Sequence, residues 1–163
     1  MDGWTVTGTI ASVGGLIVGI WVLIVAKGAR KAARAAQASG RRRDLVEELE
    51  SASEKIQQVG NFIQQEQWEP VRMRTEEILK CCRTTLNRWP DHLSEQSRNQ
   101  VMRASTLMHS IAGVIAGFGR APITEQQRRT LSEVQMRASD HISSALGEAR
   151  REQERDGGVN DGN

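Results

Sequence analysis

The sequence predicts an all-α protein with a single N-terminal transmembrane helix and a cytoplasmic antiparallel bundle of about four helices. Three observations lead to this fold class. An uncharged apolar segment lies near the N-terminus, a cluster of cations follows it, and the remaining apolar residues recur with helical spacing. The expected divisions are a short extracytoplasmic N-terminus at 1–5, the membrane helix at 6–26, a basic juxtamembrane segment at 27–43, the bundle at 44–155 and a disordered tail at 156–163.

The membrane helix is predicted from length and charge. Residues 6–26 contain no charged side chain, and about 20 such residues suffice to cross a bilayer. Asp2 is the one charged residue before this segment, whereas seven Lys and Arg residues follow it by residue 43. Cations stay on the cytoplasmic side, so we expect a single-pass protein of the plasma (inner) membrane with its N-terminus outside and its C-terminus cytoplasmic. A cleaved signal peptide, the alternative, would carry its cations before the apolar core.

Small residues recur every four positions along the predicted membrane helix, at Ala11, Gly15 and Gly19. This spacing lets two helix backbones approach closely and is typical of self-association or of pairing with another membrane protein. Small residues are also common in membrane helices generally, so both interpretations stay open.

The cations after the membrane helix are predicted to contact lipid headgroups, with about 1 kcal/mol for each cation near an anionic leaflet. Residues 1–43 carry a net charge of +6, and since the whole chain carries +2, residues 44–163 carry −4. The basic pI therefore belongs to the juxtamembrane segment and does not indicate nucleic-acid binding. The predicted headgroup contacts are Lys27, Arg30, Lys31, Arg34, Arg41, Arg42 and Arg43.

The first bundle helix, ending near Gln67, is predicted from apolar residues at alternating steps of four and three. These are Leu45, Leu49, Ala52, Ile56, Val59 and Ile63. Pairing of this stripe between two protomers as a short coiled coil is the alternative to packing within one bundle.

Three more helices follow. The second is expected from about Glu69 to Arg88, where Trp89-Pro90 ends it. Its core positions are Val71, Ile78, Leu79, Cys82 and Leu86. The third is expected over about 91–119, with core positions Leu93, Val101, Ala104, Met108, Ile111, Ile115 and Phe118. The fourth begins with a capping box at Thr124-Glu-Gln-Gln127, with core positions Leu131, Val134, Ala138, Ile142, Ala145 and Leu146.

Residues 110–119, near the end of the third helix, are uncharged and contain three glycines, of which Gly113 and Gly117 lie four residues apart. Glycine costs about 1 kcal/mol in a helix interior, so its presence needs a reason. One reason is close packing against neighbouring helices. The other is an exposed docking surface for a partner or for the bilayer surface, made by Ile111, Gly113, Val114, Gly117 and Phe118.

No catalytic, cofactor or metal-binding motif is present, which favours a non-enzymatic protein without a small-molecule substrate. His92, His109 and His141 lack the Glu-x-x-His spacing of di-metal bundles. Cys82 is expected to be a core residue with Cys81 beside it, and the two are not expected to act as a redox pair.

Two functions are compatible with this pattern. The first is a membrane-anchored interaction or scaffold protein, or a small subunit of a membrane complex, with membrane lipid and itself or another membrane or cytoplasmic protein as partners. The alternative is a membrane-active effector that oligomerises and perturbs the bilayer, which the glycine-rich membrane helix at 6–26 and the second apolar glycine-containing segment at 110–119 motivate.

Overall fold

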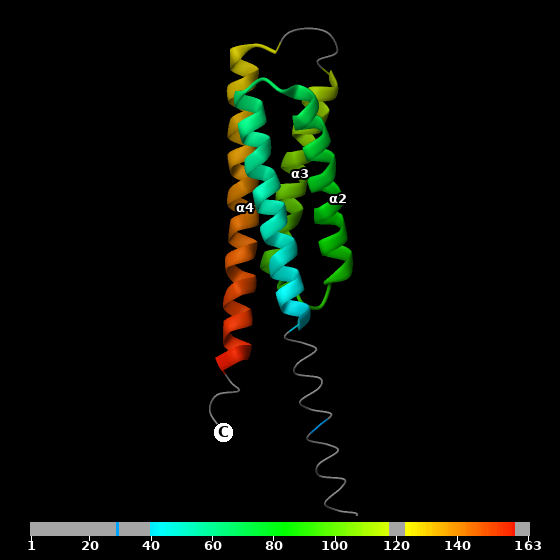
Figure 1. The fold of residues 1–163 in the computed structure, drawn as a ribbon, viewed down its shortest axis with the longest axis vertical. Coiled ribbons are helices and arrows are strands. Elements are labelled where there is room, and N and C mark those ends of the chain that lie inside the picture. Colours follow the sequence, from blue (N-terminus) through cyan, green and yellow to red (C-terminus); the bar gives the residue numbers. More distant parts are fainter. Residues whose placement is uncertain (1–28, 30–39, 118–122, 159–163) are drawn as a thin grey trace, which may run out of the picture. The chain divides into compact units, whose positions relative to one another are not determined.

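A computed structural model describes residue 29, residues 40–117 and residues 123–158 (Figure 1). The chain divides into two compact units, residues 1–40 and residues 41–163. The predicted membrane helix at 6–26, with Ala11, Gly15 and Gly19, lies outside the described residues. Within the described ranges, no helix combines the length and the apolar character that a membrane span requires.

The second unit is a bundle of four helices, as predicted, and its described residues contain no strand. The first helix covers 41–64, and the others are α2 (Trp68–Arg88), α3 (Glu95–Gly117) and α4 (Glu125–Gly158). Successive helices run in opposite directions (Figure 1). Residue 41, the α2–α3 connection and the end of α4 therefore lie at one end of the bundle. The 65–67 connection and the start of α4 lie at the other, which we call the far end.

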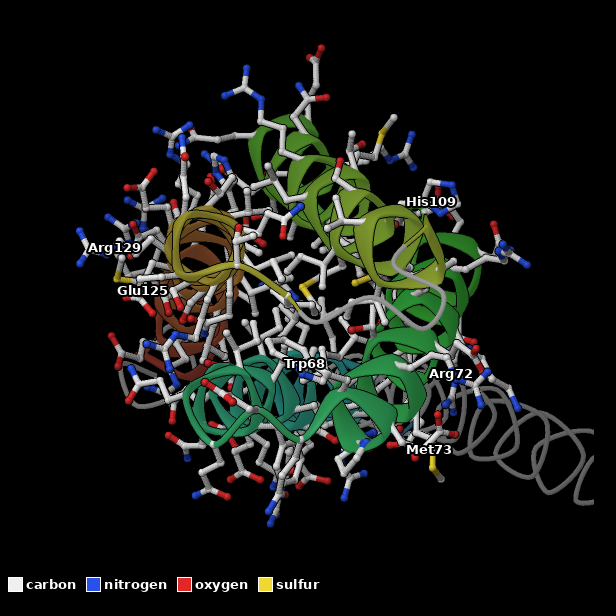
Figure 2. All side chains as sticks on the ribbon, turned by 90° about the horizontal axis from the view of Figure 1, so that it is seen from above. Trp68, Arg72, Met73, His109, Glu125 and Arg129 are labelled. Carbon is white, nitrogen blue, oxygen red and sulfur yellow. The ribbon has the colours of Figure 1, made fainter. Side chains whose placement is uncertain are left out.

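The core lies between the four helices, and charged side chains point outward around it (Figure 2). All six predicted core residues of the helix at 41–64 are buried, which confirms its stripe. On α2, Leu79 and Leu86 are only partly buried. Thr75, Thr85 and Gln135 are buried although the apolar pattern does not include them. The hydrophobic spacing therefore predicts most of the core and misses its polar members.

Two predicted boundaries are wrong. The third helix begins at Glu95 rather than near Asp91, because the Ser94 Oγ accepts a hydrogen bond from the backbone N–H of Ser97 at 3.0 Å and caps the helix there. The fourth continues to Gly158, so residues 156–158 belong to a helix and not to a disordered tail. Extending a formed helix by one turn costs much less free energy than nucleating a new helix. The polar, glycine-containing composition of residues 156–158 therefore does not by itself show where the helix ends.

Candidate docking groove

An open groove of about 480 Å³ lies at the far end of the bundle, between the last turns of α3 and the first turns of α4. Buried Ile111 and Leu131 line its inner side. Among the described residues, no charged side chain lines it. The lining residues are Ser110, Ile111, Gly113, Val114, Gly117, Gln126, Gln127, Thr130, Leu131 and Val134.

The two glycines of α3 face open space in this groove. Apart from its chain neighbours and the nearby backbone of its own helix, a Cβ atom built on Gly113 or on Gly117 would meet no atom of the described residues within 4 Å. Val114 beside them is 41% exposed. Close packing against the described helices of this chain is therefore not the reason for these glycines, and an exposed surface is what the structure shows at this position.

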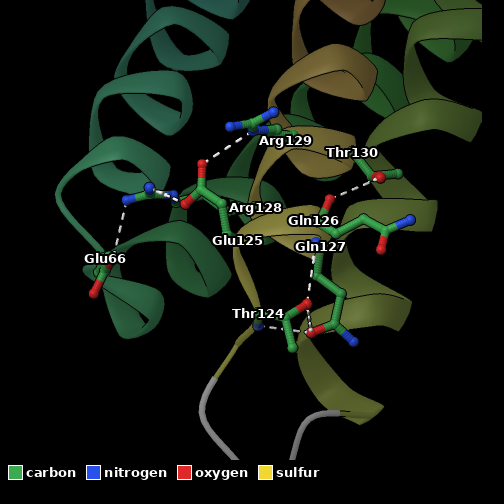
Figure 3. A network of polar contacts seen from close by, with 8 residues as sticks. All are labelled: Glu66, Thr124, Glu125, Gln126, Gln127, Arg128, Arg129 and Thr130. Carbon is green, nitrogen blue, oxygen red and sulfur yellow. Dashed lines mark hydrogen bonds and ion pairs between the residues drawn. The ribbon is translucent and has the colours of Figure 1, made fainter.

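The start of α4, which forms the other wall of the groove, is fixed by the predicted capping box (Figure 3). The backbone N–H of Gln127 donates to the Thr124 Oγ1 at 3.3 Å, and the backbone N–H of Thr124 donates to the Gln127 Oε1 at 2.8 Å. Two free donors of the first turn are thus satisfied reciprocally. Since Gln127 itself lines the groove, the cap also sets where that wall begins.

An ion-pair network holds the start of α4 against the 65–67 connection (Figure 3). Arg128 pairs with Glu66 at 2.9 Å and also with Glu125, and Arg129 pairs with Glu125 at 3.1 Å. The hydrogen bond from Arg129, followed by that from Arg128, lowers the pKa of the Glu125 carboxyl, so this carboxylate stays ionised. The network positions one wall of the groove without placing a charge in it.

The structure brings together most of the predicted docking residues. Gly113, Val114 and Gly117 line the groove, and Ile111 contributes its buried inner side. Phe118 lies outside the described residues. The α4 wall was not predicted: the capping box marks where this helix starts, but which helix faces the glycines depends on tertiary packing.

The residues of the predicted basic juxtamembrane segment are described only in part. Arg41 is exposed, Arg42 donates a hydrogen bond to the Glu152 carbonyl oxygen at 2.9 Å, and Arg43 pairs with Glu47 at 3.1 Å. The other predicted headgroup contacts lie outside the described residues: Lys27, Arg30, Lys31 and Arg34. Headgroup binding stays a prediction.

The thiols and imidazoles form no reactive cluster in the described ranges. Burial raises the pKa of Cys82 to about 12, and burial also raises the pKa of Cys81, so neither thiol is activated as a nucleophile. The His141 Nδ1 lies 2.5 Å from the Gln100 Oε1, and His92 stacks on Trp89. No group of His, Cys, Asp and Glu side chains in residues 40–117 and 123–158 is arranged to hold a metal ion.

Comparison of the chain with protein-family models, with curated proteins and with solved structures finds no match.

Proposed function

We propose that this protein is a non-enzymatic, membrane-anchored interaction protein, a scaffold or a small subunit of a membrane complex, whose bundle docks a helix of a partner protein in the groove between α3 and α4. One observation carries the proposal. Gly113 and Gly117 face open space beside exposed Val114, where no described helix of this chain covers them. Helix glycines at such a position favour close approach of a second backbone.

The lining of the groove defines the chemistry of the partner helix. Its walls are apolar or carry uncharged polar groups such as Ser110, Gln126 and Thr130. A charged side chain buried there would lack a counter-ion, which is costly. The docking face of the partner is therefore uncharged and carries small apolar residues that can lie against the glycines.

Site-specific cross-linking tests the docking groove. A photo-reactive side chain is placed at Val114, or at Met73 as the control, and the full chain is expressed at its native level in its own membranes. Met73 is 54% exposed on α2 and lines no part of the groove. We expect one discrete partner adduct from Val114 that is absent from Met73 and is lost when Gly113→Leu fills the groove. No adduct at Val114, or the same adducts from both sites, would rule out the groove as the docking surface.

Extraction tests the anchor. We expect the full chain to stay with the membrane pellet after washing with alkaline carbonate, because about 20 apolar residues hold a helix in the bilayer. Recovery of the protein in the supernatant would contradict the anchor while leaving the cross-linking result unaffected.

A further inference from the structure

A second surface of the bundle, away from the docking groove, gathers cations on both sides of α3. One open groove of about 560 Å³ lies between α3 and α4 and is lined by Arg103, Arg137 and His141. Another of about 380 Å³ lies between α2 and α3 and is lined by Arg83 and His109. His109 points outward from α3 (Figure 2). We call these five residues, with the grooves that they line, the basic face.

The arginines of the basic face have no counter-ion within the described part of the chain. Arg83, Arg103 and Arg137 are exposed and form no ion pair or hydrogen bond with another described residue. Elsewhere in the bundle seven arginines pair with glutamates. Seven of the described arginines are thus neutralised by glutamates, and the three of the basic face are not.

In the described part of the chain, no acidic side chain lines either groove of the basic face. The nearest acids along α4, Glu133 and Asp140, lie outside both linings, and Glu133 lines a separate groove with Gln64. Arg103 and Arg137 come from different helices and line the same groove, so an anionic ligand there could interact with both guanidinium groups.

We propose that the basic face binds an acidic, amphipathic polypeptide segment of a partner protein. Charge complementarity defines the acidic component, because carboxylates form charge-assisted hydrogen bonds with guanidinium groups. The apolar component follows from the walls beside the cations, where Met102 is 51% exposed and Leu79 and Leu107 are partly buried. A free phosphate would leave these apolar walls unused, and a flat bilayer would meet the ridge of α3 rather than the grooves beside it.

Thr106 provides the route between the two grooves. It lies on α3, is exposed and lines both grooves. Because its side chain is short, an extended segment can cross α3 there and place carboxylates near Arg83 on one side and near Arg103 and Arg137 on the other. No residue of the basic face lines the docking groove, so this inference does not depend on the proposed function.

Fluorescence anisotropy with the full chain in an uncharged detergent tests the inference. The probe is a fluorescein-labelled synthetic peptide of Glu-Glu-Leu repeats, with the same peptide carrying Gln in place of Glu as the uncharged comparison. We expect the acidic peptide to bind, its affinity to fall as salt rises, and the Gln peptide not to bind. Arg103→Ala with Arg137→Ala should weaken binding about tenfold or more, as expected when charge-assisted hydrogen bonds are lost.

The matched control is Arg72→Ala with Arg74→Ala, which removes the same charge from two ion-paired arginines of α2. We expect less than a twofold change in affinity, and melting curves should show that both double variants stay folded. Equal weakening in the two double variants, or equal binding of the Gln peptide, would overturn the inference, because either result means that net charge or apolar contact alone drives binding. Failure of the acidic peptide to bind, with Arg103-dependent binding to phosphatidylglycerol vesicles instead, would assign the face to a lipid surface and overturn the polypeptide ligand.

Discussion

Gly60, in the helix at 41–64, leaves room for the buried amide of Gln135 on α4. The Gln135 Nε2 donates to the Ile56 carbonyl oxygen at 3.0 Å, and Gln135 is only 8% exposed. A Cβ atom at residue 60 would lie 2.9 Å from the Gln135 Oε1. Gly60→Ala therefore forces the end of the Gln135 side chain to shift.

We expect Gly60→Ala to lower the free energy of unfolding by about 1 kcal/mol. An unsatisfied buried amide costs about 1–3 kcal/mol, and this exceeds the gain of up to about 1 kcal/mol from replacing a helix glycine by alanine. Chemical denaturation measures the effect. Gly147→Ala, where no atom lies within 4 Å of the added Cβ, is the matched control and should stabilise the protein. In a Gln135→Ala background Gly60→Ala should also become stabilising, and an unchanged sign there would contradict the steric explanation.

Polar residues of the core mark the limit of what the apolar pattern predicts. The Thr75 Oγ1 donates to the carbonyl oxygen of Val71 on its own helix at 2.7 Å, and the Thr85 Oγ1 donates to the Glu48 carboxylate at 3.0 Å. Trp89 Nε1 donates to the same carboxylate oxygen at 3.0 Å. Such residues are buried because a partner satisfies them, and for Thr85 and Trp89 that partner lies on another helix, which periodicity along one helix does not reveal.

At the scale of the element, the start of α4 is a feature that the sequence predicts well, because its signal is local. The capping box Thr124…Gln127 forms as expected because both of its partners lie within four residues. The groove beside it combines Gly113 of α3 with Leu131 of α4, and their proximity depends on how two helices pack. The glycine half of the groove could therefore be proposed from the sequence, whereas the α4 half required the structure.

We expect Thr124→Ala to lower the free energy of unfolding by about 1 kcal/mol, since the Gln127 backbone N–H loses its capping acceptor. The control is Thr130→Ala, also exposed on α4, whose hydroxyl donates only to the Gln126 carbonyl oxygen of its own helix at 3.0 Å. That variant should change stability by less than about 0.5 kcal/mol. Thermal unfolding of the two variants side by side makes the comparison, and equal losses would mean that the cap does not stabilise α4.

On the scale of the whole molecule, the two glycine pairs are predicted to have different roles. Gly113 and Gly117 face an open groove in the bundle, where we propose that a partner docks. Gly15 and Gly19 belong to the predicted membrane helix, where small residues at this spacing favour contact between helices within the bilayer. A protein that assembles through one pair and binds its partner through the other would gain avidity at the membrane.

Light scattering of the detergent-solubilised full chain separates these roles. We expect an oligomer for the wild type and a monomer for Gly15→Leu with Gly19→Leu, because leucine at both positions prevents close approach of the backbones. Gly14→Leu, which adds the same side chain off the face shared by Ala11, Gly15 and Gly19, should leave the oligomer intact. A monomeric wild type would exclude self-association through this face, and assembly would then depend on the partners of the bundle. The membrane potential on overexpression separates the two functions. A scaffold that only docks partners leaves the membrane potential unchanged. A wild-type oligomer that collapses the potential, with the collapse lost in Gly15→Leu with Gly19→Leu, would favour the membrane-active effector over the scaffold.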